Sequence, residues 1–388
     1  MAVPDNGLIF MILAWTGFLL ALWPLFFLMV PYRVQRRKMK EQGEEKKPLE
    51  GISVVVRCDS NPDGLIRVVN SFFSQNYEGA KEIIVACDPT TKNLKDTLLH
   101  LEYLHKEIYT TYVPEDTRNV SRRKLAIYLG VKAAKYDSVV IISSNTVINS
   151  ANWLKSVAEM FEKGYRVVIN PVKPLKTEGK GFMKILRKTD YTLGSLTWLS
   201  AALCGRCYRG DSNNIAYSKS LFLENKGFSK SLNLNYGDDD IFINEISRKT
   251  SCGVNVSSDG LCEVEYFTED NWESEARRRM FTSKKLDVFD RLNVYMLSIL
   301  CWAIIVLGTL GVIFGQSELG ILIASGASIL LSLIAITRIF QLSSRFVRTP
   351  FAWYQVIPSL LFRPILSVKR KIKTMGERDL NFTWKRLK

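Results

Sequence analysis

Three long runs of uncharged, mostly apolar residues constrain this 388-residue chain more than any other feature. The runs are Gly7–Tyr32, Leu292–Ser317 and Leu319–Thr337. Each is about as long as the roughly 20 residues that a helix needs to cross a bilayer. The second and third runs are joined by a short link whose only charge is Glu318, which predicts a helical hairpin. The pattern therefore predicts an integral membrane protein.

Basic residues beside the first run predict the orientation of the chain. Those that follow it are Arg33, Arg36, Arg37, Lys38 and Lys40. The segment Met1–Asn6 before it has no basic residue, whereas a cleaved signal peptide would carry positive charge there. Because basic flanks stay in the cytoplasm, we expect an uncleaved anchor with its N-terminus outside and the following domain cytoplasmic.

The formal net charge of +15 is concentrated beside the apolar runs. Residues 33–47 carry +4 and residues 338–388 carry +10, which together make 14 of the 15 charges. A nucleic-acid-binding protein carries its basic patch on the folded domain, whereas basic segments beside apolar runs are typical of contact with anionic lipid headgroups. We therefore expect membrane lipids as partners, and no nucleic acid.

The apolar and aromatic stretch Phe351–Val368 has two possible interpretations. It contains Pro358, Arg363 and Pro364, and basic residues lie on both sides of it. A fourth membrane span would place the following basic residues outside. The sequence therefore favours an interfacial or re-entrant helix.

Residues from about 50 to 285 alternate between strand and helix patterns. The clearest strand candidates are Ile52–Val56, Glu82–Ala86, Val139–Ile142 and Val167–Ile169. They are continuous apolar runs, which are typical of strands buried on both faces of a parallel sheet. The helix candidates between the first three are Leu65–Gln75 and Leu94–Leu104. The alternation predicts an α/β domain with a mainly parallel sheet.

Polar residues follow three of these strands. They lie within Arg57–Asn61, Cys87–Thr91 and Ser143–Asn145. Ligands of such sheets bind outside the carboxyl ends of the strands, so we expect the three segments to share one crevice. The sequence has no glycine-rich dinucleotide motif after the first strand and no P-loop motif, which disfavours dinucleotide oxidoreductases and P-loop NTPases.

Four segments carry a resemblance to a known family. They are residues 51–89, which begin GISVVVRCDS, GDSNNIAYSKSLFLENKGF (210–228), YGDDDIFINEI (236–246) and WESEARRRMFTSKK (272–285). In this order they resemble the membrane-bound family-2 glycosyltransferases, of a type found in bacterial membranes and related to ceramide glucosyltransferase. The resemblance implies the GT-A fold, a Rossmann-like, mainly parallel sheet. It also implies inverting transfer from a nucleotide sugar to a lipid-linked or membrane-proximal acceptor, at the bacterial inner membrane.

The resemblance covers nearly the whole chain and implies five parts. These are an N-terminal transmembrane anchor (1–32), a basic juxtamembrane linker (33–49), a cytoplasmic GT-A domain (50–285), a transmembrane hairpin (286–338), and a basic interfacial helix and tail (339–388).

The acidic run Asp238–Asp240 is the candidate for the general base. Adjacent carboxylates repel each other, so one of them can have a raised pKa, which suits a base. From spacing alone, a solvated helix N-terminus explains the run equally well, because Asp is favoured there by the helix dipole. With the resemblance, Asp239 or Asp240 is favoured over Asp238.

Other polar residues are candidates for binding the donor and the acceptor. Candidates for the nucleotide are Arg57, Asp59, Asp88, Lys124, Ser143 and Asn145, and the alternative for the charged ones on loops is simple surface charge. Glu275, Arg278 and Arg279 occupy the family's Gln-x-x-Arg-Trp positions and could bind the diphosphate. A juxtamembrane basic cluster is the alternative for these arginines. Asn214 lies in the segment that resembles the family's sugar and acceptor cleft.

One departure from the family concerns the metal site. The family has Asp-x-Asp for Mg or Mn, whereas this chain has Ser143, Ser144 and Asn145, and Cys87 stands where a carboxylate is frequent. Hydroxyl and amide groups are weak ligands for a hard dication. Two alternatives follow. The enzyme works without a tightly held metal, using its arginines, or the chain is an inactive glycosyltransferase-like membrane scaffold or binding protein.

Overall fold

The computed structural model describes residues 6–39, 50–58, 61–89, 94–117, 120–177, 179–232, 234, 236–266, 269–283 and 285–375. These residues form two compact units, which we name the helical unit and the α/β unit. The helical unit contains the described residues of Met1–Arg37, Gly179–Ser200 and Asp287–Lys373. The α/β unit contains those of Lys38–Glu178 and Ala201–Leu286.

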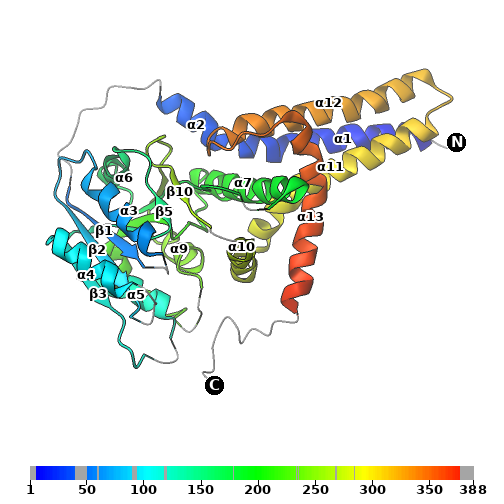
Figure 1. The fold of residues 1–388 in the computed structure, drawn as a ribbon. Helices are drawn as coiled ribbons and strands as arrows, with labels where there is room; N and C mark the ends of the chain where they lie inside the picture. The colour runs from blue at the N-terminus through cyan, green and yellow to red at the C-terminus, as the bar shows by residue number, and fades with distance from the viewer. Residues whose placement is uncertain are drawn as a thin grey trace. The chain divides into compact units, whose positions relative to one another are not determined.

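A seven-stranded sheet forms the centre of the α/β unit (Figure 1). Its strands are β1 (Ile52–Arg57), β2 (Lys81–Cys87), β3 (Ile108–Tyr112), β4 (Ser138–Ser143), β6 (Val167–Ile169), β8 (Asn214–Ser218) and β9 (Cys252–Val254). The spatial order is β3-β2-β1-β4-β8-β6-β9. All neighbours are parallel except that β8 runs antiparallel to β4 and to β6. The predicted mainly parallel α/β sheet is therefore confirmed, although the sequence had not indicated β3, β8 or β9.

Helices cover both faces of the sheet, which explains the continuous apolar strands. The helices of this unit are α3 (Pro62–Phe73), α4 (Lys95–Leu104), α5 (Arg122–Ala133), α6 (Trp153–Glu162), α8 (Lys219–Glu224), α9 (Ile241–Ile246) and α10 (Glu269–Ser283). Val54 and Val56 of β1 belong to a buried cluster with residues of α3, α4 and α6. Val55 points to the opposite face, where it lies against Gly130 of α5. All six residues of β1 are consequently buried.

The register of the central strands brings their carboxyl ends together. Arg57, the last residue of β1, lies opposite Ala86 of β2 and Ser143 of β4. The Ser144 N–H donates a hydrogen bond to the Arg57 carbonyl at 2.9 Å. The predicted meeting of the three polar segments is thus confirmed for the residues described, whereas residues 59–60 and 90–91 lie outside them.

The helix after β1 begins earlier than predicted, at Pro62. The Asn61 side chain accepts a hydrogen bond from the Gly64 N–H, and proline is favoured in the first turn because its missing N–H needs no partner there.

A second, three-stranded sheet has the order β5-β10-β7 and consists of β5 (Thr146–Val147), β7 (Val172–Pro174) and β10 (Cys262–Val264).

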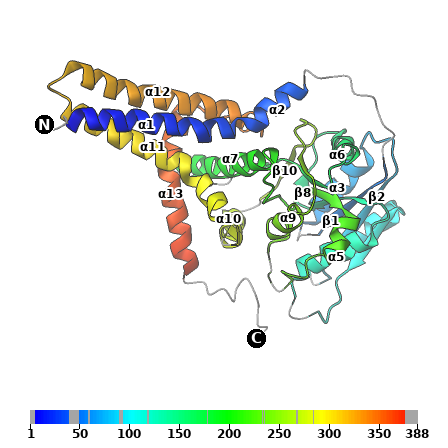
Figure 2. The same cartoon turned by 180° about the vertical axis from the view of Figure 1, so that it is seen from behind.

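The helical unit consists of α1 (Asn6–Leu28), α2 (Val30–Lys38), α7 (Gly181–Leu203), α11 (Val288–Phe314), α12 (Leu319–Ser344) and α13 (Trp353–Met375). Helices α1, α11 and α12 pack against one another, and they lie side by side in both views (Figures 1 and 2). The Trp15 indole N–H on α1 donates to the Ala324 carbonyl on α12 at 3.2 Å. Within the part of the chain that the structure describes, three segments are long and apolar enough to cross a membrane: Asn6–Leu28, Tyr295–Phe314 and Leu319–Ser344.

Helices α7 and α13 of this unit are joined by buried polar contacts. Asp190 on α7 accepts from Arg363 Nε at 2.7 Å and from Arg370 Nη1 at 2.6 Å. Both arginines lie on α13 and their side chains are only 2% and 7% exposed. Helix α13 contains Pro358 and Pro364 and is not one of the three candidate spans. Its interfacial placement stays a prediction, and so do the five predicted domain boundaries.

Gly64 is a close-packed position on which the strand ends depend. A Cβ atom there would overlap the backbone oxygen of Ser144 and the Asn61 side chain. Since overpacking typically costs 1–3 kcal/mol, Gly64→Ala should destabilise the α/β unit by about 2 kcal/mol. Gly194 on α7 is the control, because nothing lies within 4 Å of an added Cβ there. Thermal unfolding of the detergent-solubilised chain would show a lower melting temperature for Gly64→Ala. An unchanged melting temperature would contradict the close packing of Gly64 against Ser144 and Asn61.

Candidate functional site

The acidic run forms a tight turn in the α/β unit immediately before α9. Gly237 has a φ of +100°, a left-handed conformation that glycine adopts at little cost. Asp240 ends the turn, and its carboxylate accepts from the Ile241 N–H at 2.7 Å, so it caps the helix. It also accepts from the Thr282 hydroxyl and from Arg209 Nη2. Asp240 is therefore fixed by contacts to the helix and to α10.

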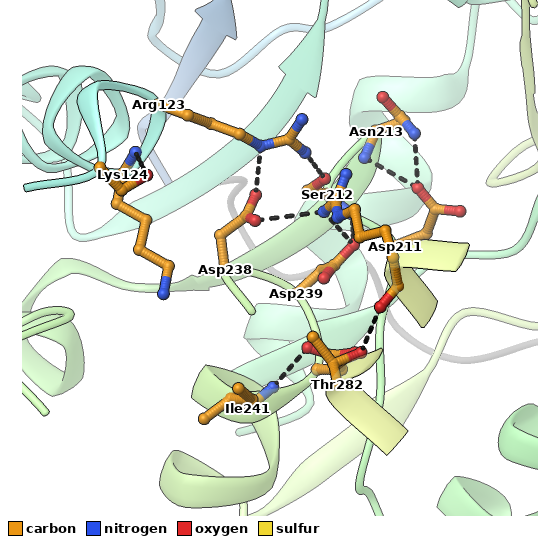
Figure 3. A network of polar contacts seen from close by, with 12 residues as sticks. Arg123, Lys124, Asp211, Ser212, Asn213, Asp238, Asp239, Ile241 and Thr282 are labelled. Carbon is orange, nitrogen blue, oxygen red and sulfur yellow. Dashed lines mark hydrogen bonds and ion pairs between the residues drawn. The ribbon is translucent and has the colours of Figure 1, made fainter. Parts of the chain in front are cut away.

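Asp238 is a buried carboxylate surrounded by arginines (Figure 3). Arg278 Nη2 lies 3.1 Å from Oδ1, and Arg123 Nε lies 3.2 Å from Oδ2. Arg57 Nη1 lies 3.9 Å from the same Oδ2. Burial alone would raise the pKa of Asp238, but the three guanidinium groups outweigh it and hold the pKa well below its ordinary value. Asp238 is thus ionised throughout the physiological pH range.

Asp239 differs from both neighbours in exposure, and from Asp238 in proton affinity. Its side chain is 15% exposed, compared with 1% for Asp238 and 3% for Asp240. Burial raises the pKa of Asp239 to about 6 against the opposing effect of Arg278, and the neighbouring carboxylates add to the rise. Arg278 Nη2 lies 3.0 Å from Asp239 Oδ2. Within the acidic run, Asp239 is the carboxyl group suited to accept a proton near neutral pH.

Helix α10 supplies the arginines that the sequence indicated. Arg278 is buried, bonds Glu275 at 3.0 Å through Nη1, and reaches both Asp238 and Asp239. Arg279 Nη2 donates to Asp211 Oδ2 at 2.9 Å. These arginines therefore belong to the same charged cluster as the acidic run.

The residues at the end of β4 are joined to the cluster by neutral contacts. The Ser143 hydroxyl donates to Asn213 Oδ1 at 2.8 Å. The same amide oxygen accepts from Arg57 Nη2 at 3.4 Å. Asn145 Oδ1 accepts from the Asn61 amide at 2.9 Å. Arg57, Ser143 and Asn145 thus lie at one edge, as predicted.

The predicted binding residues Asp88 and Lys124 contact other parts of the α/β unit. Asp88 forms two hydrogen bonds with Arg122, at 2.7 and 2.8 Å. The buried Lys124 ammonium donates to the carbonyl and hydroxyl of Ser231, and burial lowers the pKa of Lys124 to about 8.

Asn214 is also engaged within the α/β unit. Its side chain accepts from the Trp153 indole at 3.2 Å and donates to the Gly260 carbonyl at 2.9 Å. Both contacts are buried, and they attach β8 to α6 and to the loop before β10. Asp59, the remaining predicted residue, lies outside the described residues.

Sequence reasoning missed several members of the cluster. They are Arg123, Arg209, Asp211, Ser212, Asn213 and Thr282. Figure 3 labels all of these except Arg209, which donates to the Asp240 carboxylate. The sequence contains a partial signal for Asp211, Ser212 and Asn213, because these residues lie in the segment 210–228 that resembles the cleft of the family. Arg123 adjoins Lys124, and only the direction of its side chain on α5 distinguishes the two.

The oxygen atoms of the acidic run and of the end of β4, as far as they are described, do not fit a divalent cation. Among the described residues, no group of three or more His, Cys, Asp or Glu side chains is arranged to hold a metal ion. The carboxylates of the acidic run are each within 3.4 Å of an arginine nitrogen. The atoms at the end of β4 are neutral hydroxyl and amide groups, which are weak ligands for Mg or Mn.

Comparisons with known proteins give a distant resemblance in structure. No protein-family model matches this chain, and no curated protein matches it in sequence. Among solved structures, the mannosyltransferase PcManGT from Pyrobaculum calidifontis, in complex with GDP-Man and Mn2+, is 13% identical with a TM-score of 0.49, over 95% of this chain and 99% of that one.

Two structures of TarS from S. aureus are more distant. Residues 1–349 of TarS are 13% identical, with a TM-score of 0.36, over 82% of this chain and 91% of that one. A longer TarS structure is 14% identical, with a TM-score of 0.37, over 74% of this chain and 54% of that one. At these scores and identities the similarities carry no argument about the reaction.

The opposite pKa shifts of two adjacent carboxyls lead to opposite effects of pH on stability. Asp239 holds its proton more tightly in the folded chain, so the folded state binds more protons between about pH 4 and 6, and stability falls as pH rises through that window. Asp239→Asn removes this cost and should raise the melting temperature at about pH 8, with the difference shrinking towards pH 4.

Asp238→Asn is the matched comparison. The lowered pKa of Asp238 stabilises the fold above its ordinary value near pH 4, and this contribution is lost as the pH falls through the folded-state pKa. Asp238→Asn should therefore melt below the unsubstituted chain at about pH 8. Melting curves of both variants across pH 4–8 test the assignment, and differences of the same sign for the two variants would contradict it.

Proposed function

We propose that this chain is a membrane-bound, inverting glycosyltransferase of the GT-A type, which transfers a sugar from a nucleotide-sugar donor. The observation that carries the proposal is the carboxyl group of Asp239, which lies beside the Arg278 guanidinium and whose pKa of about 6 suits a general base. The mainly parallel sheet and the segments that resemble family-2 enzymes support it.

In the proposed reaction Asp239 removes the proton from the acceptor hydroxyl. The acceptor oxygen forms a bond to the anomeric carbon while the bond from that carbon to the diphosphate oxygen breaks, which inverts the configuration. The bonding electron pair leaves with the nucleoside diphosphate. Positive groups nearby, such as Arg123 and Arg278, stabilise the negative charge that develops on it.

The acceptor is proposed to be lipid-linked or membrane-proximal. The three apolar segments would anchor the chain in a bacterial inner membrane, and the basic flanks favour a cytoplasmic α/β unit. Basic residues on α13 and a row of exposed apolar ones, including Trp353, Ile365 and Ile372, favour contact of that helix with the lipid surface.

The second candidate is a catalytically silent, glycosyltransferase-like scaffold. The observation that favours it is the replacement of the family's Asp-x-Asp by Ser143–Asn145. The arrangement of Asp239 beside Arg278 favours the enzyme, because a scaffold has no need of a solvent-accessible carboxyl with a raised pKa.

Substitution of Asp239 tests whether the chain is a glycosyltransferase or a catalytically silent scaffold. Asp239→Asn should lower the release of nucleoside diphosphate from the best of a panel of UDP-, GDP- and dTDP-sugars by at least a hundredfold, since general bases contribute about 10²–10⁴. The detergent-purified chain would be assayed with added membrane lipids. Asp259→Asn is the control, because this carboxylate bonds only to Ser150 and Ser257 among the contacts described. Nucleotide binding without turnover of any donor would favour the scaffold.

The pH profile gives a separate test. Asp239 acts as a base only when it is ionised, so the rate should rise as the pH increases through about 6 and then level off. Initial rates at saturating donor between about pH 5 and 8 would show this limb. A rate independent of pH over that range would rule out Asp239 as the base.

A further inference from the structure

The end of β4 is where the resemblance places a metal, yet in this chain an arginine lies directly beside it. Arg57 is the last residue of β1 and lies directly opposite Ser143. Its side chain is 5% exposed, so its charge is held in place by the fold. A dication beside a buried guanidinium is disfavoured by charge repulsion, whereas an anion is favoured.

Two arginines from different elements converge on one oxygen atom. The Ser212 hydroxyl oxygen accepts from Arg123 Nη2 at 2.7 Å and from Arg57 Nη1 at 3.2 Å. Figure 3 shows Arg123 directed towards both Ser212 and Asp238. Two guanidinium groups that share one neutral acceptor form a ready position for a phosphate oxygen, which is the stronger acceptor.

The two arginines are held ready by the same buried carboxylate. Both lie within 4 Å of Asp238 Oδ2, at 3.9 Å for Arg57 and 3.2 Å for Arg123. Asp238 therefore acts as a positioning residue, because it balances part of their charge and fixes their direction. Arg123 also lies in the first turn of the twelve-residue helix α5, whose N-terminus adds positive potential. Its side chain is 22% exposed, which leaves it accessible to a ligand.

Neutral contacts connect this pair to the end of β4. Asn213 Oδ1 accepts both from Arg57 and from the Ser143 hydroxyl. The Ser143 hydroxyl, one of the groups at the family's metal-ligand positions, is thus hydrogen-bonded into the arginine network.

We propose that Arg57 and Arg123 bind the diphosphate of the nucleotide donor directly, without a divalent cation. This inference rests on the proposed function and adds to it the means by which the donor is held. The guanidinium groups exchange the Ser212 and Asn213 oxygens for diphosphate oxygens. Bidentate, charge-assisted hydrogen bonds supply the neutralisation that a metal provides elsewhere.

Equilibrium binding of UDP, GDP and dTDP to the full-length, detergent-purified chain tests the inference by titration calorimetry. The nucleotide that binds best should have a Kd in EDTA within about threefold of its Kd in excess Mn. Arg123→Gln should weaken binding at least tenfold under both conditions, and Arg123→Lys should weaken it less. Arg166→Gln is the matched control, because Arg166 is a surface arginine of the same unit that pairs with Glu224.

Each contrary outcome has a distinct meaning. Binding that is lost in EDTA, or strengthened more than tenfold by Mn, overturns the inference and leaves the proposed function standing. Binding in EDTA that Arg123→Gln does not weaken overturns the role of the arginine pair. No binding of any of the three nucleotides under either condition overturns both the inference and the proposed function. Melting curves of each variant establish that it is folded, and Arg57→Lys provides a second variant in the pair.

Discussion

The charged cluster depends on one buried carboxylate, that of Asp238. It is shared by Arg57 from β1, Arg123 from α5 and Arg278 from α10, so a single turn holds together three elements that are far apart in the sequence. A buried carboxylate without such partners would be strongly unfavourable, and so would the buried guanidinium groups of Arg57 and Arg278 without it. The ion pairs between Asp238 and these arginines therefore fix the conformation of the turn, and with it the position of the neighbouring Asp239.

Adjacent residues of the acidic run have different properties because their surroundings differ. Asp238 has three guanidinium groups and the Lys124 ammonium around it. Asp239 has Arg278 on one side and three carboxylates nearby, those of Asp238, Asp240 and Asp211. Asp240 serves chiefly to cap α9 and to receive the Thr282 hydroxyl. One strongly acidic group, one group near neutrality and one structural cap thus arise from three identical side chains.

Buried ion pairs also join elements within the helical unit. Asp190 and its two arginines join α7 to α13 through buried charges. Because an unpaired buried charge is costly, this pairing specifies which face of α13 meets α7. The segment Gly179–Ser200 consequently belongs with the apolar helices, although its position in the chain lies within the predicted 50–285 domain.

Local patterns in the sequence are enough to predict the buried strands and the long apolar helices. Apolar runs such as Ile52–Val56 predicted the buried parallel strands, and charge-free runs such as Leu319–Thr337 predicted the long apolar helices, because hydrophobic burial follows from periodicity and length alone. The carboxyl-edge position of Arg57, Ser143 and Asn145 followed from the parallel topology.

Which charged side chains meet depends on how elements distant in the chain pack together. Arg123 lies 115 residues before Asp238, and Arg278 lies 40 residues after it, so no local pattern relates them. The sequence treated Asp239 and Asp240 as equivalent and placed Lys124 near a phosphate, whereas the fold directs the Lys124 ammonium to Ser231 and turns Arg123 into the cluster. The physical reason is that a pKa depends on burial and on charges within a few ångströms, and both are set by how distant elements pack.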